Sequence, residues 1–185
     1  MIGPDILYFV DGDGAVILIK SSFKKQGAMA MGFQIIPLNK EQFEPLFELD
    51  DEALKAHGAM RMIADEKPGF PCRVSLQDAE IGETVLLLNY QHLSVDTPYR
   101  SKHAIFVRQN GEQANLKPNE IPQPCLKSPV AVRAFDQSGM MLDADIAEGA
   151  GLAGLIEKLL GLPEAAYLHL HFARRGCFVA KVVGA

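Results

Sequence analysis

Several features that mark common classes of protein are missing from this chain of 185 residues. It has three cysteines, Cys72, Cys125 and Cys177, and no Cys-x-x-Cys pair, a pattern that suits a reduced compartment better than a disulfide scaffold. No apolar run reaches the roughly 18 residues of a membrane-spanning helix, and the first residues lack the basic segment of a signal peptide. We therefore expect a cytoplasmic protein that is neither exported nor inserted into a membrane.

Concentrated positive charge is also absent. The chain has 18 Lys and Arg against 23 Asp and Glu, a formal net charge of -5, and its basic residues form no block. Because nucleic-acid binding relies on clustered basic side chains, we predict no nucleic-acid partner. The 48% hydrophobic and 22% charged residues are typical of a soluble globular domain.

The first thirty residues raise a question of domain boundaries. Two apolar runs, Ile6–Val10 and 15–20, flank Asp11-Gly12-Asp13-Gly14 and predict a β-hairpin. The codons for Gln26-Gly27-Ala28 can contain a ribosome-binding sequence ahead of Met31. We therefore regard residues 1–30 as a doubtful N-terminal extension or hairpin, and residues 31–185 as a single domain. N-terminal mass spectrometry of protein from the native host tests this, and a peptide covering residues 1–20 would contradict a start at Met31.

The rest of the chain alternates between short strands and short helices, with no internal repeat and no linker. The period of the apolar residues predicts a helix over 151–160, and shorter helical segments over 41–47 and 51–57. Residues 110–128, with three prolines, predict a long surface connection. Strands are predicted over 33–38, 59–64, 84–93, 104–109, 129–136, 140–146, 166–172 and 177–183. The fold class is α+β: a single antiparallel (mixed) β-sheet with a few short helices packed on it.

The last two predicted strands can be divided into faces, because successive side chains of a strand point to opposite sides. One face, the predicted core, carries Leu168, Leu170, Phe172, Cys177, Val179 and Val183. The other could line a site and carries Tyr167, His169, His171, Phe178, Ala180 and Val182.

Two patterns suggest a cofactor or a metal, but neither is complete. Residues 149–154 match G-x-G-x-x-G, yet the preceding strand alternates apolar and polar residues, and only one hairpin follows the helix. His169 and His171 point the same way, as two metal ligands do, but Cys177 falls on the opposite face, and His92 and His103 lie at no diagnostic spacing. We therefore predict no cofactor and no metal.

Two loops carry the candidate site residues. Cys72 lies between Pro71 and Arg73, where a cation could favour a reactive thiolate with His103 or His92 as its base, although a buried structural thiol is the alternative. Tyr99 and Arg100 lie in a loop between strands and offer a phenol and an anion-binding guanidinium.

Much of the chain resembles an uncharacterised bacterial family, the domain of unknown function 1203. The resemblance rests on residues 68–73, Asp78-Ala79, Gly82-Glu83, 86–90, 97–99 and 105–107, and near the end on 132–136, Gly139-Met140, 167–169 and 173–178. It runs from about Met31 to Ala185 and implies a proteobacterial source without a mechanism. This chain has Ser75 where relatives often have a second cysteine, and His171 has no clear counterpart in the pattern.

The prediction for function is a binding domain for a small, anionic ligand or for a protein partner. Its groove would combine the Cys72-Arg73 loop, Tyr99, Arg100 and the face of His169. The alternative is a thiol-dependent enzyme with Cys72 as nucleophile and a histidine, His103 or His92, as base. The sequence does not determine the oligomeric state.

Overall fold

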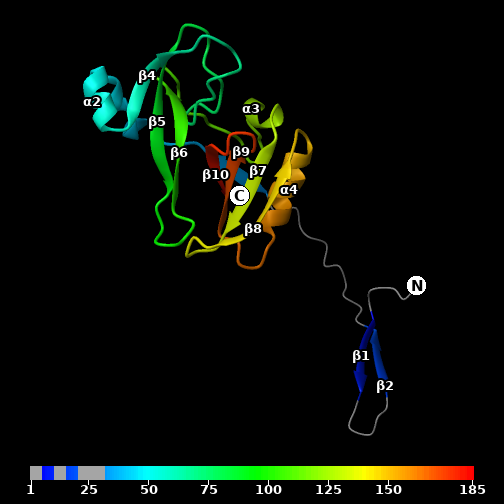
Figure 1. Cartoon of the computed structure of the whole chain (residues 1–185). Helices are drawn as coiled ribbons and strands as arrows, with labels where there is room; N and C mark the ends of the chain where they lie inside the picture. The colour runs from blue at the N-terminus through cyan, green and yellow to red at the C-terminus, as the bar shows by residue number, and fades with distance from the viewer. Residues whose placement is uncertain (1–5, 11–15, 21–31) are drawn as a thin grey trace.

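A computed structural model describes residues 6–10, 16–20 and 32–185 (Figure 1). Strands β1 (Ile6–Val10) and β2 (Val16–Lys20) pair antiparallel, as predicted for the two apolar runs. Their turn, residues 11–15, lies outside the described residues, as do residues 1–5 and 21–31. The assignment of residues 1–30 as an N-terminal extension therefore stays a prediction.

The larger sheet has five antiparallel strands in the order β3-β10-β9-β7-β8. Helix α4 (Gly151–Leu160) packs on it through the predicted stripe of Leu152, Leu155, Ile156, Leu159 and Leu160, all of which are buried. The strands are β3 (Phe33–Ile36), β7 (Val130–Phe135), β8 (Met141–Ala147), β9 (Tyr167–Phe172) and β10 (Phe178–Gly184).

A second sheet has three antiparallel strands, β4 (Ala59–Ile63), β5 (Thr84–Leu93) and β6 (Ser101–Arg108). Helix α2 (Asp51–Ala56) contacts β4, and the Asp50 side chain caps it by accepting a hydrogen bond from the Ala53 amide at 2.8 Å. The remaining short helices are η1 (Lys40–Gln42), α1 (Glu44–Phe47) and α3 (Gln123–Leu126).

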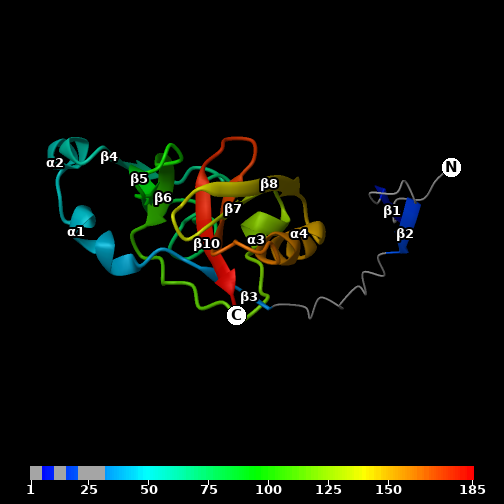
Figure 2. The ribbon, with the colours of Figure 1, turned by 90° about the horizontal axis from the view of Figure 1, so that it is seen from below.

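The prediction of a single sheet is wrong, although the α+β class and the antiparallel pairing are confirmed. Alternation of apolar residues shows that a segment is a strand, but it does not show which strands share a sheet. The larger sheet lies between α4 and the three-stranded sheet (Figures 1 and 2). The second sheet therefore lies on the side of the larger sheet that α4 does not cover.

Most predicted elements are confirmed to within three residues of their bounds, with two differences. The predicted connection 110–128 contains α3, a single helical turn that buries Cys125. The face assignment of the last strand is confirmed for Val179, which lies in the core, but is wrong from Ala180 onward, because a β-bulge between Phe178 and Ala180 shifts the register. Ala180 and Val182 consequently pair with Leu170 and Leu168 and join the core, whereas Phe178 stays beside His171.

The loop after β5 is fixed against the turn between β7 and β8. Asp136 accepts hydrogen bonds from the Ser138 and Met140 amides at 2.8 and 2.9 Å, and Gly139 has φ +85. A Cβ at Gly139 would lie 2.5 Å from a methyl carbon of Val95, so glycine permits this close approach. The contact anchors the end of the β5–β6 hairpin on the larger sheet.

The longest helix in the described part of the chain, α4, has ten residues, and none of the described helices meets the length and hydropathy needed to cross a membrane.

The core under α4 should dominate stability. Replacing the fully buried Ile156 by Ala should lower the free energy of unfolding by about 2–5 kcal/mol, because it removes buried methyl groups and leaves a cavity. Urea denaturation followed by circular dichroism measures the change. The matched control is Ile146→Ala, at a side chain that is 60% exposed, which should change the free energy by less than about 0.5 kcal/mol. Equal effects of the two substitutions would contradict the packing described here.

Candidate functional site

A groove of about 560 Å³ opens between the three-stranded sheet and the turn that joins β9 to β10. Its walls are largely apolar and are formed by two aromatic rings and four prolines: Phe106 of β6, Phe172 of β9, Pro68, Pro71, Pro124 and Pro129. Four cationic side chains and two acidic ones also line it: Arg73, Lys127, Arg174, Arg175, Glu66 and Asp78. The groove is therefore enriched in positive charge, in contrast to the chain as a whole.

Arg73 is the one of these cations that is buried, with 2% of its surface exposed. Its Nε donates to the Phe178 carbonyl oxygen at 2.7 Å, Nη1 donates to the Pro71 carbonyl oxygen, and the guanidinium lies 5.4 Å from the centre of the Phe172 ring. Burial lowers the pKa of Arg73 to about 10, against smaller opposing effects of nearby thiols and Asp78. No ion pair within the described residues neutralises this cation.

The second candidate region is a cluster of four histidines where the two sheets meet. We call His92 of β5, His103 of β6, and His169 and His171 of β9 the histidine cluster. The His92 ring stacks on His103 and on Phe178, with 4.7 Å between centroids in each pair, and it meets His169 and His171 edge-on at 5.3 and 5.1 Å. Of His92 and His103, which the sequence offered at no diagnostic spacing, His92 is the one whose ring lies against both His169 and His171.

These rings are kept uncharged mainly by burial. His169 and His171 are 3% and 0% exposed, and burial, assisted by nearby cationic and imidazole groups, lowers their pKa values to about 3 and about 2. Burial and the neighbouring His103 lower the pKa of His92 to about 4. The three rings are therefore neutral near physiological pH and keep nitrogen lone pairs available.

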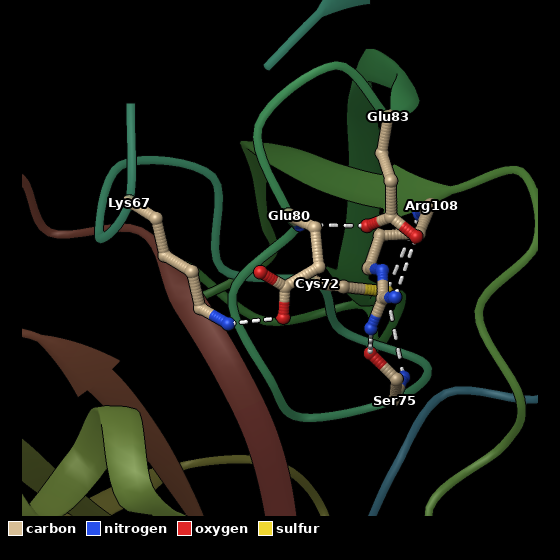
Figure 3. A network of polar contacts seen from close by, with 6 residues as sticks. All are labelled: Lys67, Cys72, Ser75, Glu80, Glu83 and Arg108. Carbon is tan, nitrogen blue, oxygen red and sulfur yellow. Dashed lines mark hydrogen bonds and ion pairs between the residues drawn. The ribbon is translucent and has the colours of Figure 1, made fainter. Parts of the chain in front are cut away.

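Cys72 occupies a different environment from the one that a nucleophile needs. Its side chain is 2% exposed and packs in the core beneath the three-stranded sheet, and its Sγ accepts hydrogen bonds from the Ser75 and Arg108 amides, each at 3.4 Å (Figure 3). Its hydrogen bonds in the described structure include none to an imidazole. The structure therefore does not bring Cys72 together with His103 or His92.

The other predicted site residues are divided between regions. Arg73 lines the groove, whereas the Tyr99 ring lies 6.4 Å from the Phe135 ring, which in turn lies 5.2 Å from His169. Arg100 is exposed in the same loop as Tyr99. Tyr99, Arg100 and His169 do not line the groove, so the residues predicted to share one site belong to neighbouring but separate places.

Comparison with known families identifies the family of this chain. A family model described as "Protein of unknown function (DUF1203)" matches residues 69–183. The chain belongs to the DUF1203 family. The match confirms the predicted resemblance, although it begins at Gly69 rather than near Met31. Neither a curated protein nor a solved structure matches the chain. Arg73, the cluster residues and the arginines of the β9–β10 turn all lie within the DUF1203 match.

Sequence reasoning missed Arg174, Arg175 and Lys127 as groove residues and His92 as a close partner of His169. Arg174-Arg175 next to Gly176 was a usable signal, because adjacent arginines in a hairpin turn project from the end of a sheet. His92 gave no comparable signal, since a register shift in β5 between Tyr90 and Leu93 precludes a simple assignment of its face.

The three thiols should differ in reactivity in the folded protein. Cys177 is half-buried and lines the groove, whereas Cys72 and Cys125 are buried, and burial raises the pKa of Cys125 to about 12. Iodoacetamide should modify Cys177 first and reach Cys72 and Cys125 only after denaturation. Peptide mass spectrometry over a time course measures this order. Modification of native Cys72 as fast as Cys177 would revive the thiol-enzyme hypothesis.

The ion pair between Glu83, just before β5, and Arg108, the last residue of β6, should weaken in acid. Arg108 Nη2 donates to Glu83 Oε1 at 2.7 Å, and Glu83 Oε2 accepts from the Glu80 amide at 2.7 Å (Figure 3). The hydrogen bond from Arg108 is the main cause of the lowered pKa of Glu83. The ionised Glu83 side chain therefore stabilises the folded protein fully above pH 4.5, the ordinary pKa of the group, and this stabilisation is lost as the pH falls through the lower pKa of the folded state.

Replacing Glu83 by Gln should therefore lower the free energy of unfolding by about 1 kcal/mol at neutral pH, and the difference from the unmodified protein should shrink in acid. Urea denaturation at a series of pH values measures both quantities. The control is Glu164→Gln at an exposed position. A difference that stays constant across the acid range would contradict this account of the network.

Proposed function

We propose that the protein binds a small organic anion in the groove between the three-stranded sheet and the β9–β10 turn. The observation that carries this proposal is Arg73, a buried guanidinium that lines the groove and has carbonyl partners but no ion pair among the described residues. A buried charge is normally paired, and a carboxylate or phosphate is the group whose geometry matches a guanidinium.

The composition of the groove supports an anion with an apolar body. Its volume of about 560 Å³ falls within the range of small-molecule sites. Phe106, Phe172 and the prolines offer apolar contact, while Arg174, Arg175 and Lys127 add exposed positive charge at the walls. Glu66 and Asp78 could accept hydrogen bonds from hydroxyl or amino groups of the same ligand.

The chemistry of the cysteines supports a reducing compartment such as the cytoplasm as the place of action. All three are free thiols, and Cys177 lines the groove.

Phenyl phosphate, with an aromatic body and an anionic head, tests the proposal, and benzyl alcohol is its uncharged counterpart. Isothermal titration calorimetry should show binding of phenyl phosphate and much weaker binding of benzyl alcohol. The double variant Arg174→Ala/Arg175→Ala should raise the Kd for phenyl phosphate at least about tenfold, because it removes two charge-assisted contacts.

The matched control is Lys55→Ala/Lys102→Ala, which removes two exposed cations that do not line the groove. It should leave the Kd within about twofold, apart from a weak long-range effect that salt suppresses. Equal losses in the two double variants, equal binding of phenyl phosphate and benzyl alcohol, or no binding of either compound would contradict the proposal.

A further inference from the structure

The histidine cluster brings together more potential metal-binding groups than aromatic packing requires. It contains four of the five histidines of the chain, drawn from three strands and both sheets. One ring nitrogen from each of His92, His169 and His171 lies within 4.8 Å of the others. Imidazole nitrogen is the most versatile protein ligand for first-row transition metals.

Hydrogen bonds fix the proton of one of these rings. His171 Nδ1 lies 3.0 Å from the Gly176 carbonyl oxygen. Because a carbonyl oxygen can only accept, Nδ1 carries the proton and Nε2 carries a lone pair. That Nε2 is buried and has no hydrogen-bond partner. A buried acceptor without a partner is costly unless another group, such as a metal ion, binds it.

His92 has a comparable outer partner. Its Nε2 lies 3.2 Å from Ser101 Oγ, which can accept the ring proton and leave the lone pair on Nδ1. Histidines that bind metals almost always donate their second nitrogen to a backbone carbonyl, a carboxylate or water, which orients the ring. The Gly176 carbonyl fits this pattern for His171, and the Ser101 hydroxyl fills the same role for His92.

The spacing of the ring nitrogens agrees with tetrahedral coordination. His92 Nδ1 and His169 Nδ1 lie 3.3 Å apart and share a hydrogen-bond proton, which a bound metal ion would displace. Two nitrogens bound to Zn²⁺ at about 2.0–2.1 Å in a tetrahedron are separated by about 3.3–3.4 Å. All three nitrogens lie within 4.8 Å of one another, so metal binding requires the set to contract by at most about 1.5 Å.

We propose that His92, His169 and His171 bind a divalent transition metal ion, of which Zn²⁺ is the best match, at the interface between the two sheets. The site is independent of the anion-binding groove, since none of the three residues lines it. Three protein ligands leave one coordination position open. Arg133, paired with His169 in the register of β7 and β9, weakens the attraction for a cation and favours an anionic or hydroxide group in that position.

His103 tests the assignment of the ligand set. It stacks on His92 at 4.7 Å and lies edge-on to His171 at 5.2 Å, yet it is outside the group of three converging nitrogens. A purely aromatic cluster would depend on His103 as much as on its neighbours, whereas a metal site built by the other three would not need it.

The experiment uses the full chain after removal of metal with EDTA. Co²⁺ added to the stripped protein should give the strong visible absorption of a tetrahedral site, and Zn²⁺ should displace it and raise Tm. Calorimetry measures the Kd for Zn²⁺. His169→Gln and His171→Gln should each raise it at least about 100-fold, more than the loss of an outer-shell partner costs, and Ser101→Ala should raise it about tenfold.

Two controls keep the test informative. His57→Gln removes the exposed histidine outside the cluster, and His103→Gln removes the stacked ring, so both should leave the Co²⁺ spectrum and the Kd within about threefold. Circular dichroism of each variant shows whether it folds. If variants at His169 or His171 fail to fold, the spectrum and the rise in Tm of the unmodified protein still decide. No tetrahedral Co²⁺ spectrum and no effect of Zn²⁺ on Tm, or equal losses in His57→Gln and His171→Gln, would overturn the proposal.

Discussion

Phe178, the first residue of β10, joins the two candidate sites. Its ring stacks on His92 with an interplanar angle of 9° and meets His169 and His171 edge-on, so it forms one wall of the histidine cluster. Its carbonyl oxygen accepts the 2.7 Å hydrogen bond from Arg73 Nε. The bulge that follows lets Phe178 face the second sheet while Val179 and Ala180 both enter the core under α4. A change in the start of β10 would therefore disturb both sites at once.

The contact between the sheets is unusually polar for a buried region. Neutral imidazoles can be buried there because each loses little hydration compared with a charged ring, but every nitrogen left without a partner has a cost. His171 Nε2 and His103 Nδ1 are both buried without hydrogen-bond partners. Aliphatic side chains would fill the same space without that cost, so the presence of imidazoles here argues for a role beyond packing.

The sequence predicts the individual strands and helices of this structure better than it predicts how the strands pair. The strand Thr84–Leu93 and helix Gly151–Leu160 have the predicted bounds, because their patterns are local. The parity of β9 placed His169 and His171 on one face, and the structure confirms it by their shared contacts with Phe178. The division into two sheets and the two register shifts depend on pairing across the chain, and no glycine or proline marks the bulge at Val179. Arg73 lines the groove of the structure, but the sequence did not indicate that Arg174 and Arg175 line it as well.

The turn between β9 and β10 determines which substitutions can separate the two sites. It carries Arg174 and Arg175, which line the groove, and Gly176, whose carbonyl oxygen accepts from His171 Nδ1. Gly176 has φ +73, a conformation that other residues adopt at a cost, so a side chain there would move the turn and alter both sites together. The arginine side chains project from the same turn without taking part in the Gly176 hydrogen bond. Their truncation therefore reports on the groove alone. Substitution of His171 also removes the hydrogen bond to the Gly176 carbonyl, so His169, whose hydrogen-bond partner is His92, is the position that reports on the cluster without releasing the turn.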